Sequence, residues 1–146
     1  MTTQRDFDYQ ALWNTALSGA RSRHGLADTA PDQSDEREPA ALTDAFGYFL
    51  LMSYAEALRQ AYATPWLTLE GLDSARWKAM EKYRLHPHQA RSMVEQDLEW
   101  ALFAELREFA LPDQALKACR PALEAAGLTS LLIPAAPASA GDRDRQ

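Results

Sequence analysis

The two histidines of the segment His86-Pro87-His88 are the residues whose spacing most suggests chemistry. Two imidazoles this close can share a metal ion if a carboxylate such as Asp97 or Glu81 approaches them. However, the segment lies where we expect one helix to end and the next to begin, and the chain contains no HExxH or paired ExxH pattern. We therefore interpret His86 and His88 as solvent-exposed turn residues. A ligand or metal site that also uses Asp97 is the alternative.

The other reactive side chains form no known catalytic pattern. Glu95 and Glu99 lie one helical turn apart, but nothing in the sequence predicts a perturbed pKa for either. Cys119 is the single cysteine, so it cannot form an internal disulfide, and we expect a packed, inert thiol. No GxSxG, GxxxxGK(S/T) or GxGxxG motif occurs among the six glycines. We expect no catalytic residue, no bound metal and no cofactor, and the sequence favours a protein that is not an enzyme.

The composition predicts an all-α protein. The 146 residues include one isoleucine, Ile133, and one valine, Val94, although these two residue types normally build strands. The apolar fraction of 47% is mostly Ala and Leu, which favour helices, with four Trp, five Tyr and five Phe. We expect a single domain over residues 1–133, an orthogonal or irregular bundle of about five helices, followed by a disordered tail over residues 134–146.

Helical periodicity places the elements along the chain. Helices are expected at about 6–22, from 39 or 43 to 63, at 73–83, at 87–110, and from 112 through a kink at Pro121 to a stop at Gly127. The middle of the second, AFGYFLLMSYAEAL, is apolar on nearly every side, which is typical of the central helix of a bundle. Residues 128–133 are the only segment able to pair as a strand.

The expected fourth helix carries two apolar stripes. The stripe assigned to the core consists of Val94, Leu98, Ala101, Leu102, Leu106 and Phe109. The second, narrower stripe consists of Met93, Trp100 and Phe103, with Gln96 and Arg107. It needs its own cover, which is either the third helix and the apolar connector at Trp66, or the surface of a subunit or partner, where Trp and Phe are favoured. We predict Met93, Trp100, Phe103 and Trp66 as partner-binding residues.

The charge distribution narrows the class of partner. The net charge of −6 argues against nucleic acids and anionic membranes, which bind through Lys and Arg. Six acids and one base lie between Asp28 and Asp44. We interpret residues 26–38 as a solvated acidic loop, with an acidic lure for a basic partner as the alternative. The amino terminus is not a signal peptide and no uncharged stretch approaches the length of a bilayer span, so we expect a cytoplasmic protein.

The segment MEKYRLHPHQARSMVEQDL resembles the LigA family, the small all-helical subunit or appended domain of LigAB-type extradiol ring-cleaving dioxygenases. The shared pattern is a Pro/polar helix start with Tyr83, Leu85, Gln89, Met93 and the pair Asp97-Leu98, and FLLMSYAEALRQAY is similar to the family's preceding apolar helix. The family's Gly-Gly-Asn/His turn is replaced here by WALFAELREF, and additional residues lie around 66–74. The resemblance implies a non-catalytic companion, because the family's iron ligands and catalytic base belong to the larger subunit.

Three functional hypotheses follow from these patterns. The first is a non-catalytic helical interaction protein, an accessory subunit or binding module that contacts a protein partner or a second copy through an exposed aromatic helix face. The second is an immunity- or antitoxin-type inhibitor of a basic toxin, because a small acidic protein is suited to electrostatic steering. The third is a small-ligand or metal-dependent helical enzyme that uses the aromatic interior with His86 and His88.

Overall fold

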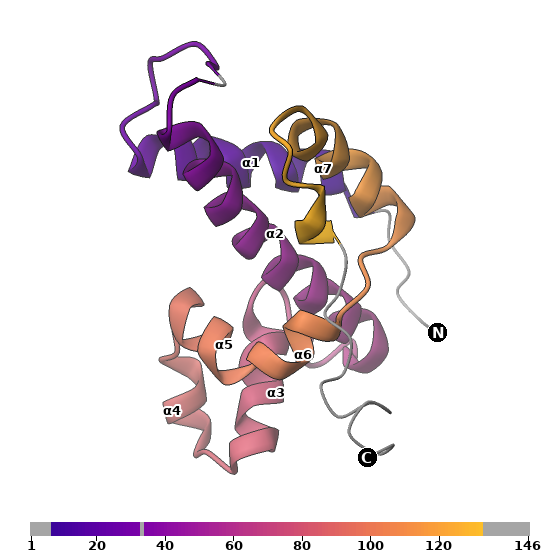
Figure 1. Cartoon of the computed structure of the whole chain (residues 1–146). Helices are drawn as coiled ribbons and strands as arrows, with labels where there is room; N and C mark the ends of the chain where they lie inside the picture. Colours follow the sequence, from indigo (N-terminus) through magenta and orange to yellow (C-terminus); the bar gives the residue numbers. More distant parts are fainter. Residues whose placement is uncertain (1–6, 33, 133–146) are drawn as a thin grey trace, which may run out of the picture.

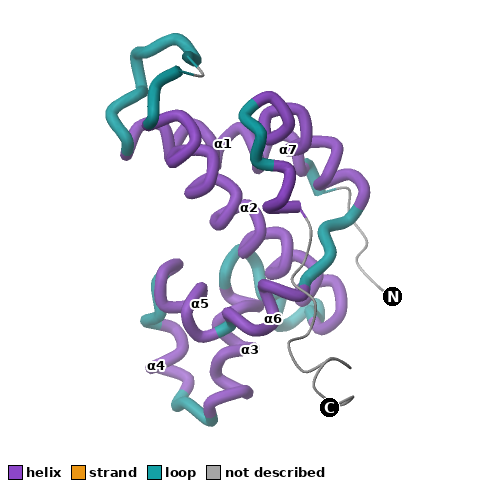
Figure 2. Tube along the Cα trace, in the orientation of Figure 1, coloured by secondary structure: helices purple, strands orange, loops and turns teal. Residues whose placement is uncertain are grey.

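The structure, a computed structural model, describes residues 7–32 and 34–132 and is built mainly of helices (Figure 1). In chain order they are α1 (Tyr9–Arg23), α2 (Arg37–Tyr62), α3 (Asp73–Tyr83), α4 (Pro87–Arg91), α5 (Glu95–Ala101), α6 (Phe103–Glu108), α7 (Asp113–Ala125) and the 3-10 helix η1 (Thr129–Leu132). The described residues form only helices and loops, with one isolated bridge that closes a turn (Figure 2). The prediction of an all-α bundle is confirmed. The expected tail, residues 134–146, lies outside the described residues.

Helix α2 is the central helix and joins two apolar clusters. The first cluster packs α1 and α7 around the first half of α2, where the Trp13 ring meets the fully buried Phe49 edge-on with the ring centroids 5.3 Å apart. The second cluster packs α3, α5 and α6 against the later half, around the buried side chains of Leu51, Leu98 and Leu102. Figure 1 shows these two groups at opposite ends of α2. The apolar sequence of α2 is therefore explained by neighbours that lie on different sides at each end.

The acidic loop is anchored to α1, so the expectation of a freely solvated segment is wrong in part. Leu26 is fully buried, and Glu38 is only 6% exposed. The two carboxylate oxygens of Glu38 accept hydrogen bonds from Nη1 of Arg21 at 2.5 and 2.6 Å. Nη2 of Arg21 donates to the carbonyl oxygens of Leu26, at 3.1 Å, and Thr29. Arg21 therefore holds the loop against α1. It also supplies the charged partner that the buried carboxylate of Glu38 requires.

The helix expected over residues 87–110 is three short helices, α4, α5 and α6. At the first break the carboxylate of Asp97 accepts the N–H of Val94 at 3.0 Å and caps the start of α5. Nε of Arg76, on α3, donates to the carbonyl of Met93 at 2.9 Å, so this carbonyl keeps a partner outside a helix. Val94 is 58% exposed, and its assignment to the core stripe is wrong because the break turns it away from the core.

Two smaller expectations concern the segments after α6. Pro121 lies inside α7, which runs on to Ala125 as one helix. Proline has no backbone N–H, so one hydrogen bond of the helix is absent at this position. Pro121 is exposed, and water can therefore bind the carbonyl oxygen that lacks this donor. The segment that was able to pair as a strand contains η1 instead. None of the helices within the described ranges has the length and apolar character needed to cross a membrane.

Candidate functional site

Two large apolar side chains, one on α5 and one at the start of α6, are exposed to solvent. Trp100 is 80% exposed, and Phe103, the first residue of α6, is 62% exposed. Trp100 follows Gln96 by four residues, and Phe103 follows Glu99 by four and Trp100 by three, so the four side chains lie along one side of the α5–α6 segment. We call these four residues the α5 face. The third helix and the Trp66 connector therefore leave Trp100 and Phe103 uncovered.

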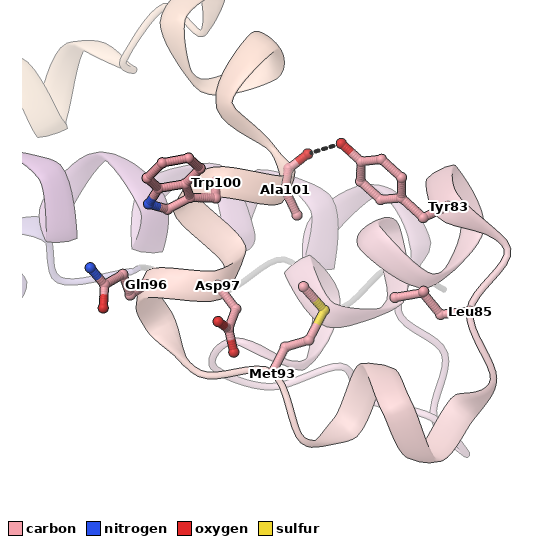
Figure 3. Close-up of a pocket in the computed structure, with 7 residues that line it drawn as sticks. All are labelled: Tyr83, Leu85, Met93, Gln96, Asp97, Trp100 and Ala101. Atoms are coloured by element: carbon pink, nitrogen blue, oxygen red, sulfur yellow. Dashed lines mark hydrogen bonds between the residues drawn. The ribbon is translucent and has the colours of Figure 1, made fainter.

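Three open grooves meet on the α5 face. The largest has a volume of about 730 Å³ and is lined by Tyr83, Leu85, Met93, Gln96, Asp97, Trp100 and Ala101 (Figure 3). The second, of about 470 Å³, lies among Glu99, Trp100 and Phe103. The third, of about 420 Å³, is lined by Arg23, Asp44, Val94, Glu95, Gln96 and Glu99. Trp100 borders the first and second grooves and Glu99 the second and third, so the three form one continuous surface.

Helix α3 fixes the end of α5 that carries Trp100. The carbonyl of Ala101, at the second break of the expected long helix, accepts hydrogen bonds from the Tyr83 hydroxyl at 2.8 Å and from Nζ of Lys82 at 3.2 Å. Lys82 also pairs with Glu105 of α6 at 2.9 Å. In Figure 3, Ala101 lies between Trp100 and Tyr83, and the Tyr83 hydroxyl points toward the Ala101 carbonyl. Both sides of the break are thereby held by α3, and the indole projects from a fixed support.

Carboxylates gather where α5 lies beside α2. The Glu99 side chain reaches Gly47, where an added Cβ would stand 3.7 Å from Oε2 of Glu99. Burial, together with the negative charges of Glu95 and Asp44, raises the pKa of the Glu99 carboxyl. Oδ2 of Asp44 lies 2.6 Å from Nε2 of His24. The α5 face is therefore bordered by negative charge on the side that faces α2.

The predicted set of His86, His88 and Asp97 does not assemble as a three-ligand group. The two imidazole rings are exposed and stack with their centroids 5.7 Å apart, while Asp97 caps α5. The backbone N–H of His86 donates to the Gln89 side chain at 2.8 Å, so this segment forms the start of α4. Among the residues that the structure describes, no group of three or more His, Cys, Asp or Glu side chains is placed to hold a metal ion.

The predicted partner-binding residues lie in two places. Trp100 and Phe103 belong to the α5 face, and Met93 lines its largest groove. Trp66 lines none of the three grooves. It is 82% exposed in a turn that Thr64 and Leu67 close with backbone hydrogen bonds of 2.9 and 3.2 Å. The structure thus separates Trp66 from the other three residues, and Met93, in the break before α5, packs partly against the second apolar cluster.

The sequence reasoning missed Asp44 as a member of the site. The sequence assigns Asp44 to the end of an acidic run, at the start of the second expected helix, whereas its carboxylate also lines the groove beside Glu95 and Glu99. The spacing of Glu95 and Glu99 was the available signal for a carboxylate pair. No local pattern joins them to Asp44, because that proximity depends on how α5 packs on α2.

Comparison with known proteins gives no match: no family model, no curated protein and no solved structure matches the chain. The resemblance to the LigA family stays a prediction. The segment that carries this resemblance contributes Tyr83, Leu85, Met93 and Asp97 to the largest groove.

Proposed function

We propose that this chain is a non-catalytic helical interaction protein, an accessory subunit or binding module whose α5 face contacts another protein. The observation that carries the proposal is the exposure of Trp100 beside Phe103 on one helix side. Adjoining exposed apolar side chains rimmed by polar residues mark interaction sites in soluble proteins. Trp is also the residue type most enriched among the side chains that supply binding energy at interfaces.

The support beneath the α5 face favours binding without a large rearrangement. Leu98 and Leu102, on the opposite side of this segment, are fully buried in the second apolar cluster. The bonds from Tyr83 and Lys82 hold the carbonyl end of α5. A partner therefore meets aromatic side chains on a backbone that is already ordered, which reduces the entropy lost on association.

The proposal is tested by comparing Trp100→Ala with Trp66→Ala in quantitative affinity capture from the native host. Loss of an interface tryptophan that contributes about 2 kcal/mol weakens binding roughly thirtyfold, so a true partner should be strongly depleted with Trp100→Ala. Trp66→Ala is the matched control, because it removes an equally exposed indole outside the three grooves. Equal depletion with both variants, or with neither, would contradict the assignment of the interface to α5.

An immunity- or antitoxin-type inhibitor of a basic toxin is the second candidate function, and the carboxylates beside the α5 face favour it. The neighbouring gene distinguishes the two candidates. A toxin-like reading frame supports the inhibitor, whereas an oxygenase-like one supports a LigA-type companion subunit. The enzyme hypothesis is tested by metal analysis of the untagged protein and by thermal-shift assays across a metabolite panel. No stoichiometric metal and no thermal shift would count against it. The absence of nucleic-acid and membrane partners and a cytoplasmic location stay predictions.

A further inference from the structure

The segment that carries the α5 face has an excess of negative charge. Residues 87–108 contain five acidic residues and two arginines. Two of the acids are engaged within the chain, since Asp97 caps α5 and Glu105 pairs with Lys82. One of the arginines, Arg107, lies over the Phe103 ring with its guanidinium carbon 5.8 Å from the ring centroid. Of the other acids, Glu95 and Glu99 line the groove beside α2.

The third groove, beside α2, contains more acidic than basic side chains. Three carboxylates, those of Asp44, Glu95 and Glu99, line it with one guanidinium, that of Arg23. Glu99 also borders the groove that contains Trp100 and Phe103. A cationic side chain in that second groove is therefore bordered by the Glu99 carboxylate and by the aromatic rings of Trp100 and Phe103, two kinds of group that favour Lys and Arg.

The charge argues against a second copy of this chain as the occupant. In a two-fold symmetric dimer the same surface patch faces itself. Such a dimer would bring the acidic grooves of both copies to one interface, and like charges gathered at an interface are costly. A different protein with positive charge removes this conflict. Its charge also complements the net charge of −6 of the whole chain.

The form of the surface indicates a helical occupant. The α5 face is a ridge of side chains at helical spacing with grooves on both sides. A second helix packs against such a ridge by inserting its own side chains into those grooves. Binding by an amphipathic helix also places apolar anchors every three or four residues, which matches the separation of Trp100 and Phe103.

We infer that the α5 face receives a basic amphipathic helix of a different protein, with Lys or Arg beside Asp44, Glu95 and Glu99 and apolar side chains over Trp100 and Phe103. This inference rests on the proposed function and adds the chemistry of the partner. It needs no movement of the backbone, because the grooves are already open.

Two designed peptides test the inference. Both are fluorescein-labelled amphipathic helices with the same leucine pattern, one with Lys and the other with Glu at the polar positions. Fluorescence anisotropy with the full chain should give a Kd at least about tenfold lower for the Lys peptide at low salt. That preference should shrink as salt is added, because exposed charges are screened. These measurements use the unaltered protein and do not depend on the folding of any variant.

Two triple variants locate the binding charge. Asp44→Asn/Glu95→Gln/Glu99→Gln removes the groove carboxylates, and we expect it to weaken binding of the Lys peptide by about tenfold or more. Asp28→Asn/Glu36→Gln/Glu124→Gln is the matched control. It removes the same charge from exposed positions outside the three grooves and should weaken binding much less. Trp100→Ala should weaken binding of the Lys peptide by a similar factor to the first triple variant.

The outcomes separate failure of the inference from failure of the proposed function. Three results would overturn the inference that the partner is basic. They are equal loss of binding with both triple variants, failure of the Lys peptide to bind, and equal affinity for both peptides. If Trp100→Ala still weakens binding of both peptides equally, the α5 face remains a protein-binding surface. If Trp100→Ala changes nothing, the proposed function also fails. A concentration-dependent dimer that Trp100→Ala abolishes in sedimentation would overturn the inference in favour of a second copy.

Discussion

Arg59→Met should strongly destabilise this protein, because Arg59 belongs to a buried ion pair near the end of α2. Nη2 and Nε of Arg59 donate to the two carboxylate oxygens of Glu56 at 2.8 and 2.9 Å. The two side chains are only 4% and 3% exposed. Methionine preserves much of the length of the side chain but removes the guanidinium, so Glu56 would keep its negative charge in a buried position without this partner.

The magnitude follows from that burial. Removing one member of a buried ion pair costs about 3–5 kcal/mol. The lower end of this range applies here, because Nε2 of Gln60 also donates to Glu56, at 3.1 Å, and continues to stabilise the carboxylate. A loss of about 3 kcal/mol is a large fraction of the 5–15 kcal/mol typical of a domain and corresponds to a fall in Tm of roughly 6–12 °C.

Urea unfolding followed by far-ultraviolet circular dichroism measures this loss. Arg37→Met is the matched control, because the Arg37 side chain that pairs with Asp35 is 51% exposed, and an ion pair with an exposed member contributes little. The double variant Glu56→Leu/Arg59→Met should recover most of the lost stability, since no charge of the pair is left buried. If Arg59→Met shifts the urea midpoint no further than Arg37→Met, the pair is hydrated in solution and the reasoning from burial is wrong.

Three further predictions concern single side chains. Burial raises the pKa of the Cys119 thiol to about 11 from an ordinary 9.0. Near neutral pH the reactive thiolate should therefore be about a hundredfold less abundant than on an exposed cysteine, and a disulfide reagent should label Cys119 slowly. Fast labelling would show that α7 opens. Because the folded state holds the Glu99 proton more tightly than the unfolded state, the ionised carboxyl destabilises the fold above its ordinary pKa. Glu99→Gln should therefore raise Tm by about 1–2 °C near pH 7, and this gain should disappear on acidification. A gain that persists at low pH would show that the ionised carboxyl is not its cause. Asp97→Ala should cost about 1 kcal/mol in urea unfolding through loss of the cap on Val94, and an unchanged midpoint would show that the cap is not formed.

The sequence predicts the central helix well because its apolar residues are numerous and unbroken. The segment around Phe49 and Leu51 is apolar on nearly every side, and the structure places neighbours around it at both ends. The third helix also begins and ends close to where it is expected, since the His86-Pro87 step marks the following boundary. Local signals suffice wherever an element is both periodic and clearly terminated.

The breaks between α4, α5 and α6 were not predictable from periodicity, because no Gly or Pro marks them. The first break has a local signal, a carboxylate three residues after Val94, which caps α5. The second, at Leu102, has no comparable side-chain cap. It depends on contacts from Lys82 and Tyr83 of α3, which only the packed structure brings to Ala101. Tertiary contacts therefore decided where the expected long helix ended.

The spacing of the buried leucines explains why the aromatic side chains face outward. Leu98, Leu102 and Leu106 follow one another at intervals of four and are all buried in the second apolar cluster. At about 100° per residue, Trp100 lies roughly 200° around the helix from Leu98, so it cannot enter the core while Leu98 does. The core thus gains nothing from the indole, and Trp100→Ala should reduce binding without shifting the urea midpoint. Leu98→Ala would instead lower stability through the cavity that it creates. A loss of binding without a loss of stability would identify Trp100 as a binding residue, whereas a loss of stability identifies Leu98 as a core residue.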